Sequence, residues 1–276
     1  MTSSKSTAIY DSTQRTLPAI DELRGAWQYR SLIAQLVRRD ITTRYKRSVL
    51  GVAWTMLNPL GTTLILAIVF SRAFGSGPEY AAYVLSGLIA WNFFSQTVNA
   101  SMLHLIWGEG LLKRIYLPRT VFALSASGTG LVNVFLSLVP LVLIMLFTGV
   151  PIRWTILFLP VPILFMALFA LGFGLLISTI AVYFADVAEM YQVGIVAWMY
   201  LSPIIYHEEI LPESYRFWIT RLNPMYHLIK TFRAPIYDGV LPSIEQTLIA
   251  ASIGLITFAI GWLVFTSKAD EFAYRI

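Results

Sequence analysis

Six long stretches without an Asp, Glu, Lys or Arg residue constrain this chain more than any other feature of its sequence. They cover residues 48–71, 80–108, 120–152, 154–185, 190–207 and 246–267. A helix that crosses a bilayer needs about 20 mostly apolar residues. The pattern therefore predicts an all-α polytopic membrane protein, with six transmembrane helices in a domain that covers residues 48–267.

Prolines and glycines add detail to these stretches. Pro160 and Pro162 are predicted to kink the fourth helix near its start. The fifth stretch is the shortest and ends at Ser202-Pro203, which predicts a broken or tapering span. Close approach of neighbouring helices is expected at Gly128, Gly130, Gly172 and Gly174.

The composition agrees with a membrane-embedded core. Apolar residues make up 57% of the chain and charged residues 13%, whereas a soluble domain is about a quarter charged. The net charge of +5 is concentrated beside the apolar stretches, so it indicates orientation in a membrane rather than binding to nucleic acid. The chain has no cysteine and its three histidines are scattered, so we expect no metal site and no catalytic residue.

Basic residues gather on one side of the predicted helices. Residues 1–50 hold nine Lys or Arg residues and 109–119 hold three, whereas 72–79 and 153 hold one each. Because cytoplasmic loops are rich in Lys and Arg, the basic segments and both termini are predicted to be cytoplasmic. The last external segment, 207–243, is too charged for a span and too aromatic for a hydrophilic loop. We expect short external re-entrant helices there, with a folded cap over the bundle as the alternative.

The first 47 residues are predicted to form two cytoplasmic parts. Residues 1–26 lack an apolar core and are expected to be flexible, and residues 268–276 are expected to form a short cytoplasmic tail. Residues 27–47 are predicted to form an amphipathic interface helix, in which Asp40 and Arg44 are spaced to pair. Its apolar face is expected to hold Tyr29, Leu32, Ile33, Leu36 and Val37.

The chain resembles a known family of membrane proteins. The run RDITTRYKRSVLGVAWTMLNP (39–59) is similar to the entry segment of the transmembrane permease subunit of bacterial polysaccharide ABC exporters, which handle O-antigen, capsule and teichoic acid chains. The segments GLLKRIYLPR (110–119), YLSPIIYHEEILPESYRFWITRLNPMYHLIKTFR (200–233) and the final FAYRI extend the resemblance over most of residues 27–276. It implies a multi-pass protein of the bacterial inner membrane that moves a glycan attached to a polyprenyl diphosphate.

The resemblance also implies partners. Two copies would form a homodimer with a channel between them, and two separate ATPase subunits would bind ATP and Mg²⁺. The sequence contains no G-x-x-x-x-G-K-[ST], so the chain is expected to have no ATP site or enzymatic activity of its own and no cofactor. The residues expected to couple it to the ATPase are Leu112, Lys113, Arg114, Ile115, Tyr116, Pro118, Arg119, Arg38 and Asp40. The alternative for the basic residues in this set is that they only orient the protein in the membrane, as the positive-inside rule describes.

A polysaccharide path is expected to be wet, uncharged and lined with aromatic rings, because sugar hydroxyls need hydrogen bonds and sugar C–H faces stack on rings. The candidates in the first, second and fifth spans are Trp54, Asn58, Asn92, Gln96, Asn99, Tyr191, Trp198, Ser202 and Tyr206. Polar bonding between packed helices is the alternative for each. The cations expected to meet either the diphosphate or anionic lipid headgroups are Arg39, Arg44, Lys46 and Arg47.

Other functional classes make different demands on the sequence. A secondary transporter carries ionisable residues at mid-membrane, whereas these stretches contain no Asp, Glu, Lys or Arg. A membrane enzyme needs a cluster of acidic or histidine side chains, which 207–213 alone offers. An ABC permease that exports a smaller lipid or a drug is the nearest alternative.

Overall fold

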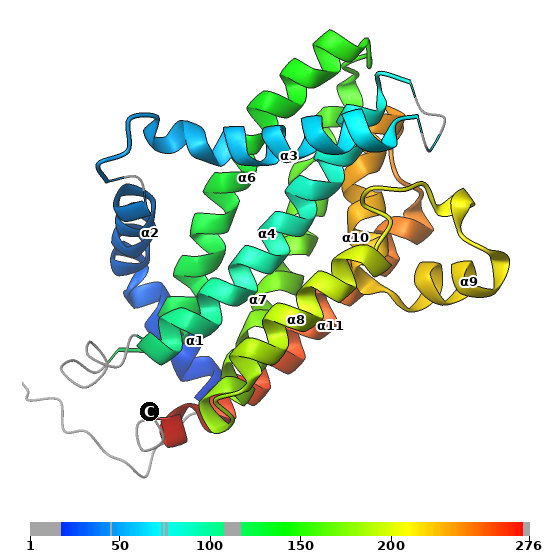
Figure 1. The fold of residues 1–276 in the computed structure, drawn as a ribbon. Helices are drawn as coiled ribbons and strands as arrows, with labels where there is room; N and C mark the ends of the chain where they lie inside the picture. The colour runs from blue at the N-terminus through cyan, green and yellow to red at the C-terminus, as the bar shows by residue number, and fades with distance from the viewer. Residues whose placement is uncertain (1–17, 45, 73, 75–76, 108–116, 273–276) are drawn as a thin grey trace, which may run out of the picture.

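Long helices run side by side through the computed structural model, which describes residues 18–272 except 45, 73, 75–76 and 108–116 (Figure 1). The α-helices are α1 (Pro18–Gln28), α2 (Arg30–Arg44), α3 (Trp54–Phe70), α4 (Tyr80–Trp107), α6 (Thr120–Thr148), α7 (Pro160–Tyr183), α8 (Val187–Leu201), α9 (Glu213–Leu222), α10 (Pro224–Arg233) and α11 (Ile244–Lys268). Single turns of other helix types are η1 (Gly51–Ala53), η2 (Trp154–Phe158), η3 (Glu208–Ile210), η4 (Ala234–Asp238) and η5 (Ala269–Glu271). No strand occurs among these described residues, which confirms the all-α prediction for them.

Each uncharged stretch contains one long helix: α3, α4, α6, α7, α8 and α11 in that order. Four segments in the described chain are long and apolar enough to cross a membrane: Gly51–Phe70, Thr120–Thr148, Trp154–Tyr183 and Ile244–Lys268. α4 has 28 residues, but polar side chains lower its hydropathy, and α8 has 15 residues, fewer than the roughly 20 that a span needs. The six-span count therefore stays a prediction.

Prolines set two of the helix ends. Pro160 is the first residue of α7 and follows η2, so it starts a helix rather than kinking one. α8 ends at Leu201 because Pro203 disfavours a helical conformation for the residue before it, and Ser202 is extended at φ −103° and ψ 136°. The predicted taper of the fifth stretch thus takes the form of a short helix.

Helices α7 and α11 pack with their backbones in close contact. A Cβ atom on Gly261 would lie 2.1 Å from the carbonyl oxygen of Gly172, and one on Gly172 would lie 2.4 Å from the carbonyl oxygen of Thr257. Glycine on both helices is what allows this approach. The expectation of close packing at Gly172 is confirmed.

The N-terminal helices differ from expectation. Residues 18–26 belong to α1, where Trp262 Nε1 donates to the Ala19 carbonyl at 3.1 Å and Thr120 Oγ1 donates to Glu22 Oε2 at 2.7 Å. Those bonds tie α1 to α11 and α6, so this part of the expected flexible segment is docked; residues 1–17 lie outside the described chain. The predicted apolar face of α2 is its less exposed side, and Val37 packs against Gly128 of α6.

Helix α3 crosses the neighbouring long helices at a steep angle (Figure 1). Its buried residues are Pro59 and Thr63, while apolar side chains such as Ile65 and Ile68 are exposed. The chain enters α3 through an elbow, residues 46–51, in which Arg47 has φ 68° and Gly51 has φ 52°. Positive φ is unusual for a residue with a Cβ atom, so Arg47 marks a sharp turn.

The segment 207–243 folds into η3, α9, α10 and η4, as short helices were expected there. The side chains of Met225, Leu228, Ile229 and Phe232 bury one face of α10 against the bundle. α9 projects away from the bundle (Figure 1) and exposes Trp218 and Phe217. The segment therefore has a docked half and an exposed aromatic half.

Candidate functional site in a polar cavity

A cavity of about 470 Å³ lies where α3, α4 and α6 meet. We call it the polar cavity, because amide and hydroxyl side chains make up much of its lining. Its lining residues are Arg44, Trp54, Thr55, Asn58, Pro59, Thr62, Leu88, Ile89, Asn92, Phe93, Gln96, Gly130, Asn133, Val134, Ser137 and Met199.

Helical spacing explains why these polar groups converge. Each of the three helices contributes residues three or four positions apart, which share one face. The sets are Trp54, Asn58 and Thr62 on α3, Leu88, Asn92 and Gln96 on α4, and Gly130, Asn133 and Ser137 on α6. Gly130 also leaves room for α4, because a Cβ atom there would lie 2.5 Å from the Thr97 hydroxyl.

The lining suits an uncharged ligand that is rich in hydroxyl groups. Asn and Gln side chains both donate and accept hydrogen bonds, and Ser and Thr hydroxyls do the same. The indole of Trp54 adds an aromatic face for stacking, and Trp54 is 50% exposed. Arg44, the last residue of α2, brings a cation to the same cavity.

Four of the nine predicted glycan-lining residues meet here: Trp54, Asn58, Asn92 and Gln96. Four further polar lining residues were not predicted from the sequence: Thr55, Thr62, Asn133 and Ser137. The spacing of Gly130, Asn133 and Ser137 was a usable signal, but it stood inside a stretch that was interpreted only as a span.

The structure places the other five predicted lining residues outside this cavity, where four of them hold α8 to its neighbours and Tyr206 bonds back to α8. Their bonds are Gln192 Nε2 to Asn99 Oδ1 at 2.7 Å, Tyr191 OH to the Ser95 carbonyl at 2.9 Å, Trp198 Nε1 to Asn223 Oδ1 at 2.9 Å, Asn223 Nδ2 to Ser202 Oγ at 2.9 Å, and Tyr206 OH to the Tyr200 carbonyl at 2.9 Å. These contacts match the helix-packing alternative.

The four cations expected to meet a diphosphate or lipid headgroups lie in three different environments. Arg44 lines the polar cavity, while Lys46 and Arg47 are exposed on the elbow. Arg39 Nη2 lies 3.0 Å from Asp40 Oδ1. Asp40 therefore pairs with Arg39, and the expected pair with Arg44 does not form. The other oxygen of Asp40 lies 3.7 Å from His104 Nε2 of α4, which turns this carboxylate inward.

The predicted ATPase-coupling residues are only partly described. Leu112, Lys113, Arg114, Ile115 and Tyr116 lie outside the described residues. Arg38 is exposed on α2, and the Arg119 guanidinium carbon lies 5.6 Å from the ring centre of Phe272. Pro118 packs beside Gly25, so the start of α6 is joined to α1 and to the end of the described chain.

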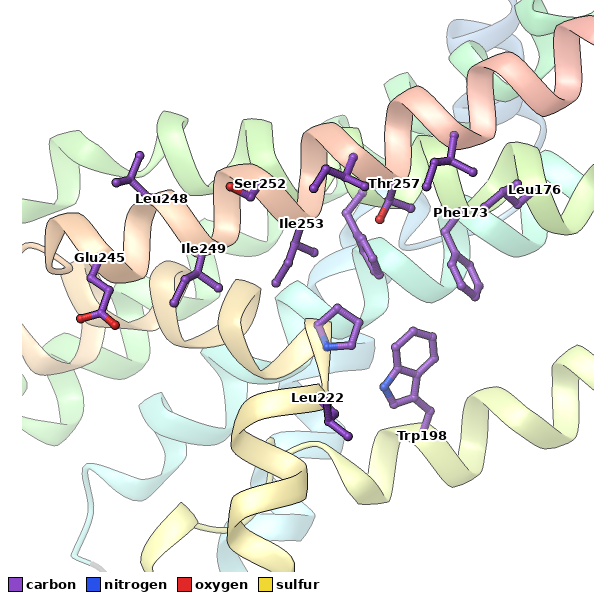
Figure 2. Close-up of a pocket in the computed structure, with 14 residues that line it drawn as sticks. Phe173, Leu176, Trp198, Leu222, Glu245, Leu248, Ile249, Ser252, Ile253 and Thr257 are labelled. Atoms are coloured by element: carbon purple, nitrogen blue, oxygen red, sulfur yellow. The ribbon is translucent and has the colours of Figure 1, made fainter.

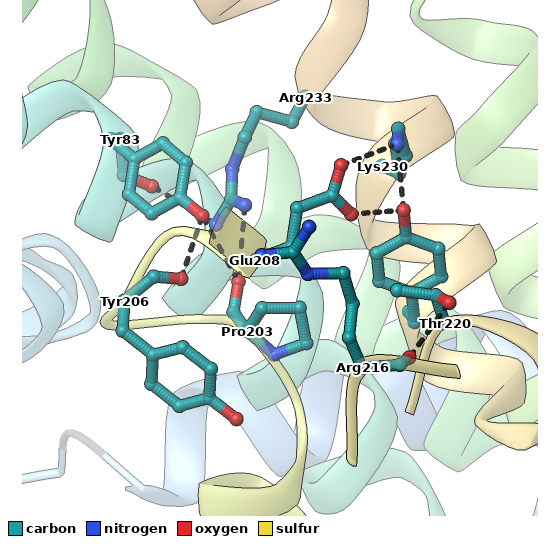
Figure 3. Close-up of polar contacts among 9 residues, drawn as sticks. Tyr83, Pro203, Tyr206, Glu208, Arg216, Thr220, Lys230 and Arg233 are labelled. Carbon is teal, nitrogen blue, oxygen red and sulfur yellow. Dashed lines mark hydrogen bonds and ion pairs between the residues drawn. The ribbon is translucent and has the colours of Figure 1, made fainter. Parts of the chain in front are cut away.

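A second polar site, which the sequence analysis did not identify, surrounds Arg233 (Figure 3). Arg233 donates to the Pro203 carbonyl at 3.1 Å and to the Tyr83 and Ile204 carbonyls at 3.3 Å. Among the described residues no carboxylate lies within ion-pair distance of this buried cation. Arg233 therefore fixes the chain that follows α8 to α4 through backbone oxygens.

Beside it, Glu208 and Lys230 form an ion pair with an Nζ–Oε1 distance of 3.0 Å (Figure 3). Tyr226 donates to Glu208 and accepts from Lys230 at 2.6 Å. Burial raises the pKa of the Glu208 carboxyl, but the bonds from Tyr226 and Lys230 outweigh that effect and hold it below its ordinary value. η3 is thereby anchored to α10.

Comparison with known proteins agrees with this architecture. Residues 31–237 match the ABC-2 type transporter family. The O-antigen export system permease protein RfbA of Myxococcus xanthus is 30% identical over 257 residues, which cover 92% of this chain and 98% of that protein. The capsule polysaccharide export inner-membrane protein CtrC of Neisseria meningitidis serogroup A is 24% identical over 246 residues, which cover 84% of this chain and 89% of that protein. The resemblance seen in the sequence is confirmed: this chain belongs to the ABC-2 type transporter family.

Proposed function

We propose that this chain is the transmembrane subunit of an ATP-driven exporter, which moves a polysaccharide linked to a polyprenyl diphosphate across the bacterial inner membrane. The observation that carries the proposal is the polar cavity, whose neutral amide, hydroxyl and indole groups suit sugars. The relatives named for O-antigen and capsule export support the same substrate class.

In this proposal the work is divided between polypeptides. The sequence has no phosphate-binding loop, so two separate ATPase subunits bind ATP and Mg²⁺ and dock on the cytoplasmic side. Residues 112–119 and the exposed Arg38 form the coupling surface. Two copies of this chain enclose the channel, and the polar cavity of each copy contributes to its wall.

The membrane arrangement follows from the charge pattern. α4 and α8 cross the bilayer together with the four more apolar segments, and α1 and α2 lie at the cytoplasmic surface with both termini. Arg44 then lies at the cytoplasmic entrance to the polar cavity, where a guanidinium meets the carrier diphosphate. Lys46 and Arg47 on the elbow extend that cationic entrance.

Deletion of the gene tests the proposal. Surface polysaccharide should disappear while lipid-linked polymer accumulates inside the cell, and expression of the wild-type chain should restore export. Loss of surface polysaccharide without accumulation contradicts an export role. Transport by the purified chain under an ion gradient, without ATPase or ATP, would instead identify a secondary transporter.

A further inference from the structure

An apolar groove of about 780 Å³ runs along α11, bordered by α7, α8 and the junction of α9 with α10 (Figure 2). Phe173 and Trp198 form part of its floor, and α11 lines it from Glu245 to Ile260. Those fifteen steps correspond to about 22 Å at 1.5 Å per residue. One leaflet of a bilayer has a hydrocarbon thickness of about 15 Å, half of 30 Å. The groove has the length and chemistry of one extended hydrocarbon chain.

The groove continues into a second cavity of about 480 Å³ at the Ile244 end of α11. We call this the head cavity; Glu245 and Ile249 line both spaces, so they are contiguous. Its remaining lining residues are mostly polar and include Arg221, His227, Lys230 and Gln246. An apolar groove that ends in a polar head cavity matches a molecule with a hydrocarbon tail and a charged head group.

The charged residues that line the head cavity indicate which type of lipid head group it binds. Lys230 is neutralised by Glu208 at 3.0 Å. Burial lowers the pKa of His227, so its ring is uncharged at neutral pH. This leaves Arg221 and Glu245, for which no ion pair occurs among the described residues. One positive and one negative group complement a zwitterion better than an anion.

The remaining polar groups agree with this assignment. Gln246 lines the head cavity, and its buried Nε2 atom has no hydrogen-bond partner among the described residues, so a rotation of the side chain would give a phosphate oxygen a donor. A carboxylate such as Glu245 accepts hydrogen bonds from a primary ammonium group. A quaternary ammonium group donates none and is bound by aromatic rings instead. The head cavity therefore favours a primary amine over a choline group.

We propose that the groove and the head cavity bind a phosphatidylethanolamine-type phospholipid of the surrounding bilayer. One acyl chain lies along α11, the phosphate contacts Arg221 and Gln246, and the amine contacts Glu245. The site lies between α7, α8, α10 and α11 and shares no lining residue with the polar cavity. Its occupancy is independent of the glycan that the exporter carries.

The test is native mass spectrometry of the complete complex, purified in mild detergent and equilibrated with equal amounts of phosphatidylethanolamine, phosphatidylcholine and phosphatidylglycerol. We expect one phosphatidylethanolamine retained per copy of this chain. Glu245→Gln should lower its retention about tenfold relative to phosphatidylglycerol, as loss of one charge-assisted contact implies. The matched control is Glu213→Gln, because Glu213 is exposed on α9 and should leave the ratio unchanged.

A second pair of variants tests the groove itself. Ile253→Trp should fill it and abolish retention, whereas Leu263→Trp, on an exposed face of the same helix, should not. Thermal unfolding and gel filtration establish that each variant is folded. Equal retention of the three lipids in the wild type, or retention unchanged in both Glu245→Gln and Ile253→Trp, overturns the proposal. Selective retention of the polyprenyl carrier, or cross-linking of Ile253 to a second copy, also overturns it.

Discussion

The guanidinium carbon of Arg233 lies 3.6 Å from the centre of the Tyr83 ring, so a cation at the end of α10 is stacked on an aromatic side chain of α4. The same guanidinium bonds the Pro203 and Ile204 carbonyls, which stand where α8 has just ended. One side chain thus joins α10, α4 and the chain after α8.

Replacement of Arg233 should therefore be costly. Arg233→Lys keeps the charge but loses the planar fork that reaches several carbonyls at once. We expect a loss of about 2–4 kcal/mol in the free energy of unfolding, because carbonyls and a buried cation are left poorly paired. Thermal unfolding in detergent measures it, and Arg72→Lys at an exposed position is the control. Equal stability of the two variants would contradict the role assigned to Arg233.

The α7–α11 contact predicts different effects for two glycine substitutions. Gly172→Ala places a methyl group 2.4 Å from the Thr257 carbonyl oxygen and should destabilise the protein by about 1–3 kcal/mol. The added methyl group of Gly194→Ala on α8 meets no described atom outside its own helix turn within 4 Å, so this variant should be neutral or stabilise by up to about 1 kcal/mol, since alanine favours helix. The melting temperature of Gly172→Ala should fall, whereas that of Gly194→Ala should stay the same or rise.

The polar cavity predicts an export defect without a folding defect. Asn92→Leu combined with Asn133→Leu removes two amides from the lining and should slow export about tenfold, as loss of one or two hydrogen bonds to the substrate implies. The rate at which new polysaccharide reaches the cell surface measures it. Asn99→Leu, on α4 but outside the cavity, is the comparison; a larger defect there would place the glycan path elsewhere.

The Glu208–Lys230 pair predicts how stability depends on pH. The folded pKa of Glu208 lies below the ordinary 4.5, so its contribution is present above pH 4.5 and is lost as the pH falls through the lowered value. The pKa of Lys230 is raised by Tyr226 and Glu208 despite burial, so its contribution is complete below 10.5 and is lost at higher pH. Both groups are partly exposed, so the pair adds at most about 1 kcal/mol.

Protease cleavage within 207–243 reports on that pair. Resistance should be constant between about pH 7 and pH 9, decline below pH 6.5 as the half-buried His207 and His227 become protonated, and fall further below pH 4.5 as Glu208 is protonated. Glu208→Gln should remove the loss below pH 4.5, whereas Glu209→Gln should leave it in place, since Glu209 is exposed. An identical pH profile in both variants would show that another group controls the segment.

Sequence patterns predicted the features that depend on local periodicity. The uncharged stretches located α3, α4, α6, α7, α8 and α11, and the apolar spacing in α2 identified the side that faces α6. The 3–4 spacing of Asn92 and Gln96 placed both on the face that lines the cavity. These features are set by residues a few positions apart, so a single sequence contains the information.

Features that depend on distant contacts were not predictable in this way. The bond between Trp262 and Ala19 joins positions 243 residues apart, and without it α1 resembles a polar, flexible segment. Arg233 stood in the sequence as one of several external cations, although its partners lie on α4 and beyond α8. Asp40 lies beside Arg39 and His104 because the packing of α2 near α4 turns its carboxylate inward.

The shallow seating of α3 has a mechanical consequence. Two of its residues are buried, whereas α11 is in direct backbone contact with α7 through Gly172 and Gly261. Separating α7 from α11 breaks a continuous interlocked surface. Rotating α3 outward about the Arg47–Gly51 elbow exposes few side chains of α3 that were buried. Of these two helices, α3 therefore moves away from the bundle at the lower energy, and its movement would open the polar cavity on the side that α3 now covers.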